Sequence, residues 1–141
     1  MYLLEPRYRS QFIAPWDEAG QIAAYMNMAG DLGLYTGQQE WLVLLPQNAT
    51  LQKIKSALAN VKLFVDSEVM LCQESPNGRY EILQVWNVGK EAGDHTLQEE
   101  LWATWSPAAG LTQLVRGSKY DRRKDLRGFH LKVASIETYL T

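Results

Sequence analysis

The positions of apolar residues predict a helix near the start of the chain. These residues recur at the spacing that lines one face of a helix: Ala19, Ile22, Ala23, Met26 and Ala29. Asp17 is placed to cap the start of this helix, and Gly30 and Gly33 indicate its end. Before the helix, residues 1–15 predict a loop with a short strand at Phe12 and Ile13.

The next segments continue the alternation of helix and strand. Residues 41–45 form a continuous apolar run, which predicts a strand covered on both faces. A second amphipathic helix follows, and its apolar stripe consists of Leu51, Ile54, Ala57, Leu58 and Val61. Residues 63–65 then predict further strand.

A β-hairpin is predicted in the middle of the chain. Its turn is Ser75-Pro76-Asn77-Gly78, in which Asn-Gly adopts positive φ at low cost. The turn separates an apolar strand at 69–72 from a strand at 80–88. The order of helix, strand, helix, strand and hairpin predicts an α/β or α+β fold, with a mixed sheet and flanking helices.

The last third of the chain gives weaker signals. Residues 95–105 are ambiguous, because Leu97, Leu101 and Trp105 recur at helical spacing while Pro107 prevents a longer helix. The charged residues 120–127 predict a linker, and residues 129–136 predict a final strand.

Composition restricts the classes of protein that remain. The chain has 141 residues, of which 46% are apolar and 21% charged, so it suits one globular domain. With 14 Lys plus Arg against 16 Asp plus Glu, the net charge of −2 gives no general basic surface for nucleic acid. The single cysteine, Cys72, rules out an intrachain disulfide framework and is expected to be a buried thiol.

The two ends fit a piece of a longer chain as well as they fit a small cytosolic protein. The first nine residues lack the basic, apolar and small-residue regions of a signal peptide. No stretch approaches the roughly 20 apolar residues of a membrane span. The other end stops soon after the predicted strand 129–136 begins.

The residues supply little material for catalysis. His95 and His130 lie far apart in the sequence, without partners at metal-ligand spacing, and no nucleophile elbow or phosphate-binding glycine loop is present. Asp66 and Glu68 are two residues apart and would share one face of a strand, where two carboxylates can share a proton. A solvated edge explains them better, so we predict no enzyme and no cofactor.

Two surface features are candidate sites. Asn48-Ala49-Thr50 matches the N-glycosylation acceptor, although Asn48 is also placed to cap the helix that starts at Leu51. The cationic cluster consists of Arg122, Arg123, Lys124 and Arg127. We interpret this cluster as an exposed linker, or as a contact with acidic lipid headgroups or a protein partner. Asp121 and Asp125 within it argue against a nucleic-acid patch.

The cationic cluster and the residues after it carry a resemblance to a known family. The run from Asp121 to Ala134 resembles the junction of insect chemosensory ionotropic receptors, in which basic residues and an L-x-G precede the first strand of a glutamate-receptor-like ligand-binding domain. Four segments upstream resemble segments of the same receptors in the same order; they are 40–45, 63–69, 82–89 and 102–111. The resemblance therefore spans residues 38–136.

The resemblance implies a fold, a division into parts and a role. Residues 1–119 would be a partial amino-terminal extracellular domain, resembling part of a periplasmic-binding-protein-like lobe. Residues 120–128 would be a basic linker, and residues 129–141 the truncated first strand of the ligand-binding domain. The parent would be an odour-sensing ligand-gated cation channel of the plasma membrane, and this extracellular segment would pack subunits and position the ligand-binding domain.

The resemblance also implies partners. Other receptor subunits, including a co-receptor, would form a hetero-oligomer with the parent. A small odorant would bind outside these residues, and segments further downstream would cross the membrane. Secretion, which the resemblance implies, would permit glycosylation of Asn48. Two alternatives stay open: a small soluble α/β binding module without catalysis, and an enzyme in which a pocket joins Asp66 and Glu68 to a third titratable group.

Overall fold

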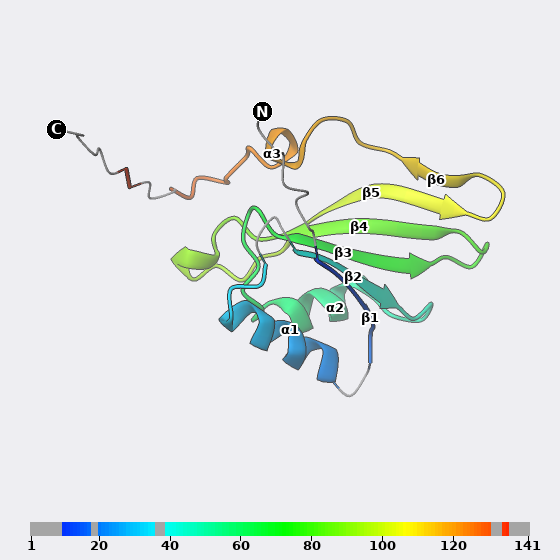
Figure 1. Cartoon of the computed structure of the whole chain (residues 1–141), viewed down its shortest axis with the longest axis horizontal. Coiled ribbons are helices and arrows are strands. Elements are labelled where there is room, and N and C mark those ends of the chain that lie inside the picture. The colour runs from blue at the N-terminus through cyan, green and yellow to red at the C-terminus, as the bar shows by residue number, and fades with distance from the viewer. Residues whose placement is uncertain (1–9, 18–19, 36–38, 131–133, 136–141) are drawn as a thin grey trace, which may run out of the picture.

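A computed structural model describes residues 10–17, 20–35, 39–130 and 134–135. Figure 1 shows the described helices and strands in chain order. They are β1 (Ser10–Pro15), α1 (Gln21–Asp31), β2 (Gln39–Leu45), α2 (Leu51–Leu58), β3 (Glu68–Glu74), β4 (Tyr80–Trp86), the 3-10 turn η1 (Lys90–Ala92), β5 (Gln98–Ser106), β6 (Gly110–Gln113) and α3 (Lys119–Arg122).

The strands form one mixed sheet whose spatial order follows the chain order, from β1 to β6. The strands β1, β2 and β3 are parallel, and the remaining neighbours pair antiparallel. Helices α1 and α2 connect the parallel strands. Because both right-handed crossovers move in the same direction across the sheet, both helices belong on the same face. The predicted mixed sheet with flanking helices is confirmed, whereas the likeness to a periplasmic-binding-protein-like lobe stays a prediction.

The first helix begins at Gln21 with Gly20 at the N-cap position, so Asp17 is not the cap residue itself, although its side chain bonds to the start of the helix. The carboxylate of Asp17 accepts hydrogen bonds from the backbone N–H groups of Gln21 (3.2 Å) and Ile22 (2.9 Å), which the helix itself leaves unpaired. Past the end of α1, the hydroxyl of Tyr35 donates to the carbonyl of Met26 at 2.7 Å. Burial raises the pKa of the Tyr35 hydroxyl, so it remains a donor.

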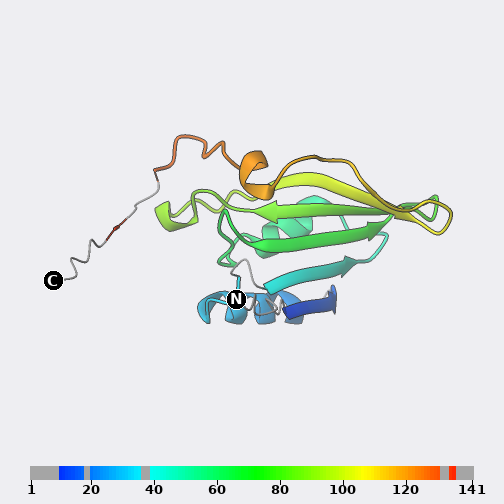
Figure 2. The ribbon, with the colours of Figure 1, turned by 45° about the horizontal axis from the view of Figure 1, so that its top comes forward.

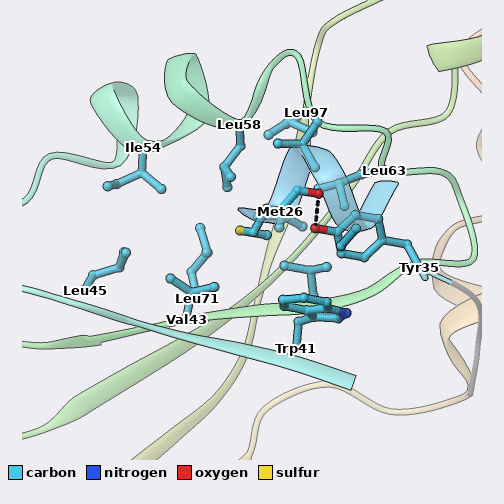
Figure 3. Packing of buried hydrophobic residues seen from close by; sticks show 14 residues of the cluster. Met26, Tyr35, Trp41, Val43, Leu45, Ile54, Leu58, Leu63, Leu71 and Leu97 are labelled. Carbon is cyan, nitrogen blue, oxygen red and sulfur yellow. Dashed lines mark hydrogen bonds between the residues drawn. The ribbon is translucent and has the colours of Figure 1, made fainter. Parts of the chain in front are cut away.

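The core lies between the sheet and these two helices. Figure 3 shows Met26 of α1 and Leu58 of α2 meeting Val43 and Leu71 of the sheet. The buried cluster consists of Met26, Ala29, Tyr35, Trp41, Val43, Leu45, Ile54, Leu58, Val61, Leu63, Val69, Leu71, Val85 and Leu97. This one-sided core accounts for the helical stripes in the sequence, because each stripe faces the sheet.

The opposite side of the sheet corrects a prediction about β2. This strand was expected to be covered on both faces, yet Leu44 is 40% exposed and the neighbouring strand exposes 67% of Ile13. The strand register places an apolar set on this side, which we call the open face: Ile13, Leu42, Leu44, Met70, Cys72, Tyr80, Ile82, Trp105 and Leu111. The described helices α1 and α2 cannot cover it, because both crossovers lie on the other side. Cys72 is buried, as predicted.

Three further segments complete the comparison with the sequence. Residues 95–105, which are ambiguous in the sequence, contain all but the last residue of the strand β5, paired on both sides with β4 and β6. Residues 63–65, predicted as strand, form a loop in which the N–H of Phe64 donates to the hydroxyl of Ser67 at 2.9 Å. Of the predicted final strand, Phe129 and His130 are not in a strand, and residues 131–133 and 136 lie outside the described residues.

Candidate functional site at the C-terminal segment

The chain after β6 turns back onto the sheet and forms the short helix α3 beside one end of the open face. Figure 2 shows α3 on the side of the sheet away from α1. The helix starts with a capping box, in which the hydroxyl of Ser118 accepts from the N–H of Asp121 (3.2 Å) and the carboxylate of Asp121 accepts from the N–H of Ser118 (3.2 Å). The Ser118 hydroxyl also donates to the Asp121 carboxylate at 2.8 Å, and this hydrogen bond, together with the one from the Ser118 N–H, holds the pKa of the Asp121 carboxyl below its usual range.

Two cations of this helix pair with carboxylates on the sheet. The ammonium of Lys119 lies 2.7 Å from a carboxylate oxygen of Glu68 and donates to the carbonyl of Asp66 at 2.6 Å. The guanidinium of Arg122 donates to the amide oxygen of Gln84 at 3.0 Å and to the carboxylate of Glu100. Both cationic side chains are largely shielded from water, which strengthens these pairs relative to exposed ones.

The third cation, Arg123, is almost completely buried. Only 2% of the residue is exposed, and its guanidinium donates to the backbone carbonyls of Val65 (2.7 Å) and Ser67 (2.8 Å). The guanidinium also lies 4.6 Å from the ring centroid of Trp86, within cation–π range. We call Lys119, Arg122 and Arg123 the clamp, since they join α3 to the end of the sheet.

No carboxylate pairs directly with the guanidinium of Arg123, and its Nε and Nη2 atoms are buried without a hydrogen-bond partner among the described residues. Burial lowers the pKa of its guanidinium, while the carboxylates of Glu68, Glu100 and Asp66 raise it from a longer range. An arginine keeps its proton even so, because the ordinary pKa of a guanidinium lies far above neutral pH. The clamp therefore places a permanent positive charge inside the protein, held by two carbonyl oxygens and an aromatic face.

These contacts correct the interpretation of the cationic cluster as an exposed linker. Arg122 and Arg123 pack onto the sheet, whereas Lys124 and Arg127 are exposed. Sequence reasoning missed Lys119, Glu68, Glu100 and Trp86 as members of the same site. One signal was available, because Ser118 followed three residues later by Asp121 matches a helix-start signature.

The two acids of the pair have different surroundings. Asp66 lies in the turn before β3, and Glu68 opens that strand with its carboxylate on Lys119. In the part of the chain that the structure describes, no three His, Cys, Asp or Glu side chains gather as a metal site would need. His95 lies 3.0 Å from the carbonyl of Ala59, and His130 is exposed.

Asn48 lies exposed in the loop between β2 and α2. The alternative role suggested for it was to cap the second helix. That expectation is wrong, because α2 begins after Thr50 and no side chain from the cap position bonds to its N-terminus. The acceptor sequence thus lies on an accessible loop, as attachment of a glycan would require.

Within the described ranges, no helix has both the length and the apolar character to cross a bilayer. The fold and the clamp together define an α/β module whose C-terminal segment is fastened to its own sheet. A family model described as "Ionotropic receptor 75a N-terminal" matches residues 21–136. The chain therefore belongs to the family of ionotropic receptor N-terminal regions, and the resemblance to insect chemosensory ionotropic receptors is confirmed.

The matched range includes the parallel strands β2 and β3, the hairpin and the clamp. This family is a receptor region and not a known enzyme family. No curated protein and no solved structure matches the chain.

Proposed function

We propose that this chain is an extracellular part of an odour-sensing ligand-gated cation channel, and that it positions the ligand-binding domain without catalysing a reaction. Membership of the ionotropic receptor family supports the receptor role. Under this proposal residues 1–119 form part of the amino-terminal domain, residues 120–128 the basic linker, and residues 129–141 the start of the ligand-binding domain.

The clamp is the observation that carries the positioning role. A free basic linker would let the next domain turn independently, whereas α3 is tied to β3, β4 and the loop before β3. The chain therefore reaches Lys124 at a fixed place relative to the sheet. When the ligand-binding domain moves during gating, the junction would then stay fixed relative to the sheet of the amino-terminal domain.

A charge exchange within the clamp tests this function. In the full receptor expressed with its co-receptor, Arg122→Glu places a second carboxylate beside Glu100, so odour-evoked current per receptor at the cell surface is expected to fall several-fold. Adding Glu100→Arg restores an opposite-charge pair and should recover most of the current. The matched control is Lys124→Glu, which changes the charge equally at an exposed position.

Equal currents from the wild type and the Arg122→Glu receptor, at equal surface amounts, would contradict the positioning role. An Arg122→Glu receptor whose current the added Glu100→Arg does not recover would speak against a direct contact between the two side chains. The surface amounts are measured by biotinylation, because loss of folding would reduce current without any effect on gating.

We propose in addition that the open face packs against another receptor subunit of the hetero-oligomer. Its exposed apolar side chains, including Leu44 and Trp105, form a patch of the kind that marks protein contacts. Co-purification of the co-receptor at the wild-type level with a receptor carrying Leu44→Glu would count against this contact. Leu32→Glu is the matched control, because Leu32 is exposed at the end of α1 and outside the open face.

Glycosylation of Asn48 is a further expected property of an extracellular segment. Expression through the secretory pathway should yield a protein whose gel mobility increases after treatment with an N-glycosidase. Asn48→Gln should migrate as the treated wild type does. A mobility that the enzyme leaves unchanged would remove Asn48 as a glycan site.

A further inference from the structure

The chain contacts the body of the protein a second time, beyond the clamp, at Phe129. A tight turn precedes this residue, because Arg127 (φ 52°) and Gly128 (φ 80°) both adopt left-handed backbone conformations. The N–H of Phe129 closes the turn by donating to the carbonyl of Leu126 at 2.9 Å. The turn directs the Phe129 ring onto the loop that follows β4.

The ring lies against Gly89, where any side chain would occupy the space that the ring fills. A Cβ added at Gly89 would lie 2.6 Å from both Cε2 and Cζ of Phe129 and 2.9 Å from Cβ of Asp94, well inside van der Waals contact. The backbone does not require a glycine there, since Gly89 has φ −113° and ψ 15°. The absence of a side chain at Gly89 therefore creates the seat for the Phe129 ring.

The loop that carries Gly89 is itself well fixed. The side chain of Asn87, which is buried, accepts from the N–H of Gly89 (2.8 Å) and donates to the carbonyl of Asp94 (2.8 Å). The N–H of Asp94 donates in turn to the carbonyl of Gly89 at 3.0 Å. Phe129 thus rests on a loop closed by its own hydrogen bonds.

A hollow of about 320 Å³ lies beside this contact. Its walls come from two sources: the body, including Phe64 and Asp66, and the exit segment, with Phe129 and His130. The ring is therefore part of the boundary between the body and the segment that leaves it. Loss of the ring would open this boundary without removing any residue of the clamp.

We propose that Phe129 and Gly89 form a second anchor, and that Phe129, the first residue of the segment 129–141, is a positioning residue for the ligand-binding domain that this segment begins. This inference rests on the proposed positioning function. One anchor at Arg123 would leave the exit segment free to pivot. Two anchors, at Arg123 and Phe129, fix the direction in which residues 124–128 run and the place from which the next domain starts.

Limited trypsin digestion of the 141-residue chain tests the anchor, because Lys124 and Arg127 lie between the two attachment points and are exposed. Cleavage requires local release of several residues, so Phe129→Ala should speed cleavage after Arg127 by about tenfold. Cleavage after Arg79, in the exposed turn of the hairpin, serves as the internal reference and should keep its wild-type rate. The products are identified by mass spectrometry.

A second variant disturbs the same contact by changing Gly89 in place of Phe129. Gly89→Ala inserts a methyl group where the ring lies and should also speed cleavage after Arg127. Its matched control is Gly93→Ala in the same loop, where an added Cβ meets nothing within 4 Å although the φ of 82° is unfavourable for alanine. The control should leave cleavage after Arg127 at the wild-type rate.

Cleavage after Arg127 at the wild-type rate in both Phe129→Ala and Gly89→Ala would overturn the second anchor. The positioning function would still stand if the Arg122→Glu receptor lost current. In the converse case, faster cleavage in both variants supports the anchor, and unchanged current in the Arg122→Glu receptor would defeat only the proposed function.

Discussion

Replacement of Arg123 by alanine is expected to lower the free energy of unfolding by about 3 kcal/mol. The substitution leaves the carbonyls of Val65 and Ser67 without their buried donor and removes the cation from the face of Trp86. It also leaves a cavity where a side chain of a residue only 2% exposed had been. Each of these losses acts on the folded state in the same direction.

Urea unfolding of the 141-residue chain measures this effect. Lys124→Ala is the neighbouring control, because Lys124 is exposed and its loss should change stability by less than about 0.5 kcal/mol. Arg123→Met keeps much of the side-chain volume and should recover part of the loss, since only the hydrogen bonds and the charge are then missing. If Arg123→Ala and Lys124→Ala unfold at the same urea concentration, Arg123 is not the buried anchor described above.

Two leucines on opposite sides of the sheet should respond very differently to the same substitution. Leu71→Ala is expected to cost about 3 kcal/mol, because Leu71 is fully buried between β3 and the two helices. Leu44→Ala should cost about 1 kcal/mol or less, because that side chain is already 40% exposed on the open face. Because both substitutions are leucine to alanine, a difference between the two losses of stability reports which side of the sheet is buried.

Thermal or urea unfolding of both variants gives the comparison. Equal losses of stability would mean that the open face is covered within the 141-residue chain, against the architecture described here. A loss at Leu71 alone would support a core confined to the helix side. The open face would then remain available to another subunit, as proposed for the receptor.

The sequence predicted the elements that local patterns determine. The side chain of Asp17 bonds to the first backbone N–H groups of α1, although Gly20 occupies the N-cap position, and the Asn77-Gly78 turn joins β3 to β4 in the predicted hairpin. The ambiguity at residues 95–105 has a simple cause. A spacing of four residues, as between Leu97, Leu101 and Trp105, fits one face of a helix and is also even, so it fits one face of a strand. Pairing with β4 and β6 decides between the two.

The clamp was harder to predict, because a sequence shows which residues are charged but does not show whether their side chains are buried. Arg123 is buried by contacts with backbone carbonyls 56 and 58 residues earlier in the chain, and carbonyls leave no trace in a sequence. Lys124, its neighbour, is exposed although it carries the same charge. The contact between Gly89 and Phe129 could not be predicted for a similar reason, since it depends on where the ring of Phe129 lies in the folded protein.

Amide hydrogen exchange at α3 tests most directly whether the C-terminal segment is fastened to the sheet. The N–H groups of Arg122 and Arg123 donate to the carbonyls of Ser118 and Lys119, but a four-residue helix has no stability of its own. A docked α3 predicts that these two amides exchange orders of magnitude more slowly than an unfolded chain, and that Arg123→Ala abolishes the protection. Exchange of both amides at the unfolded rate in the wild-type chain would contradict the clamp.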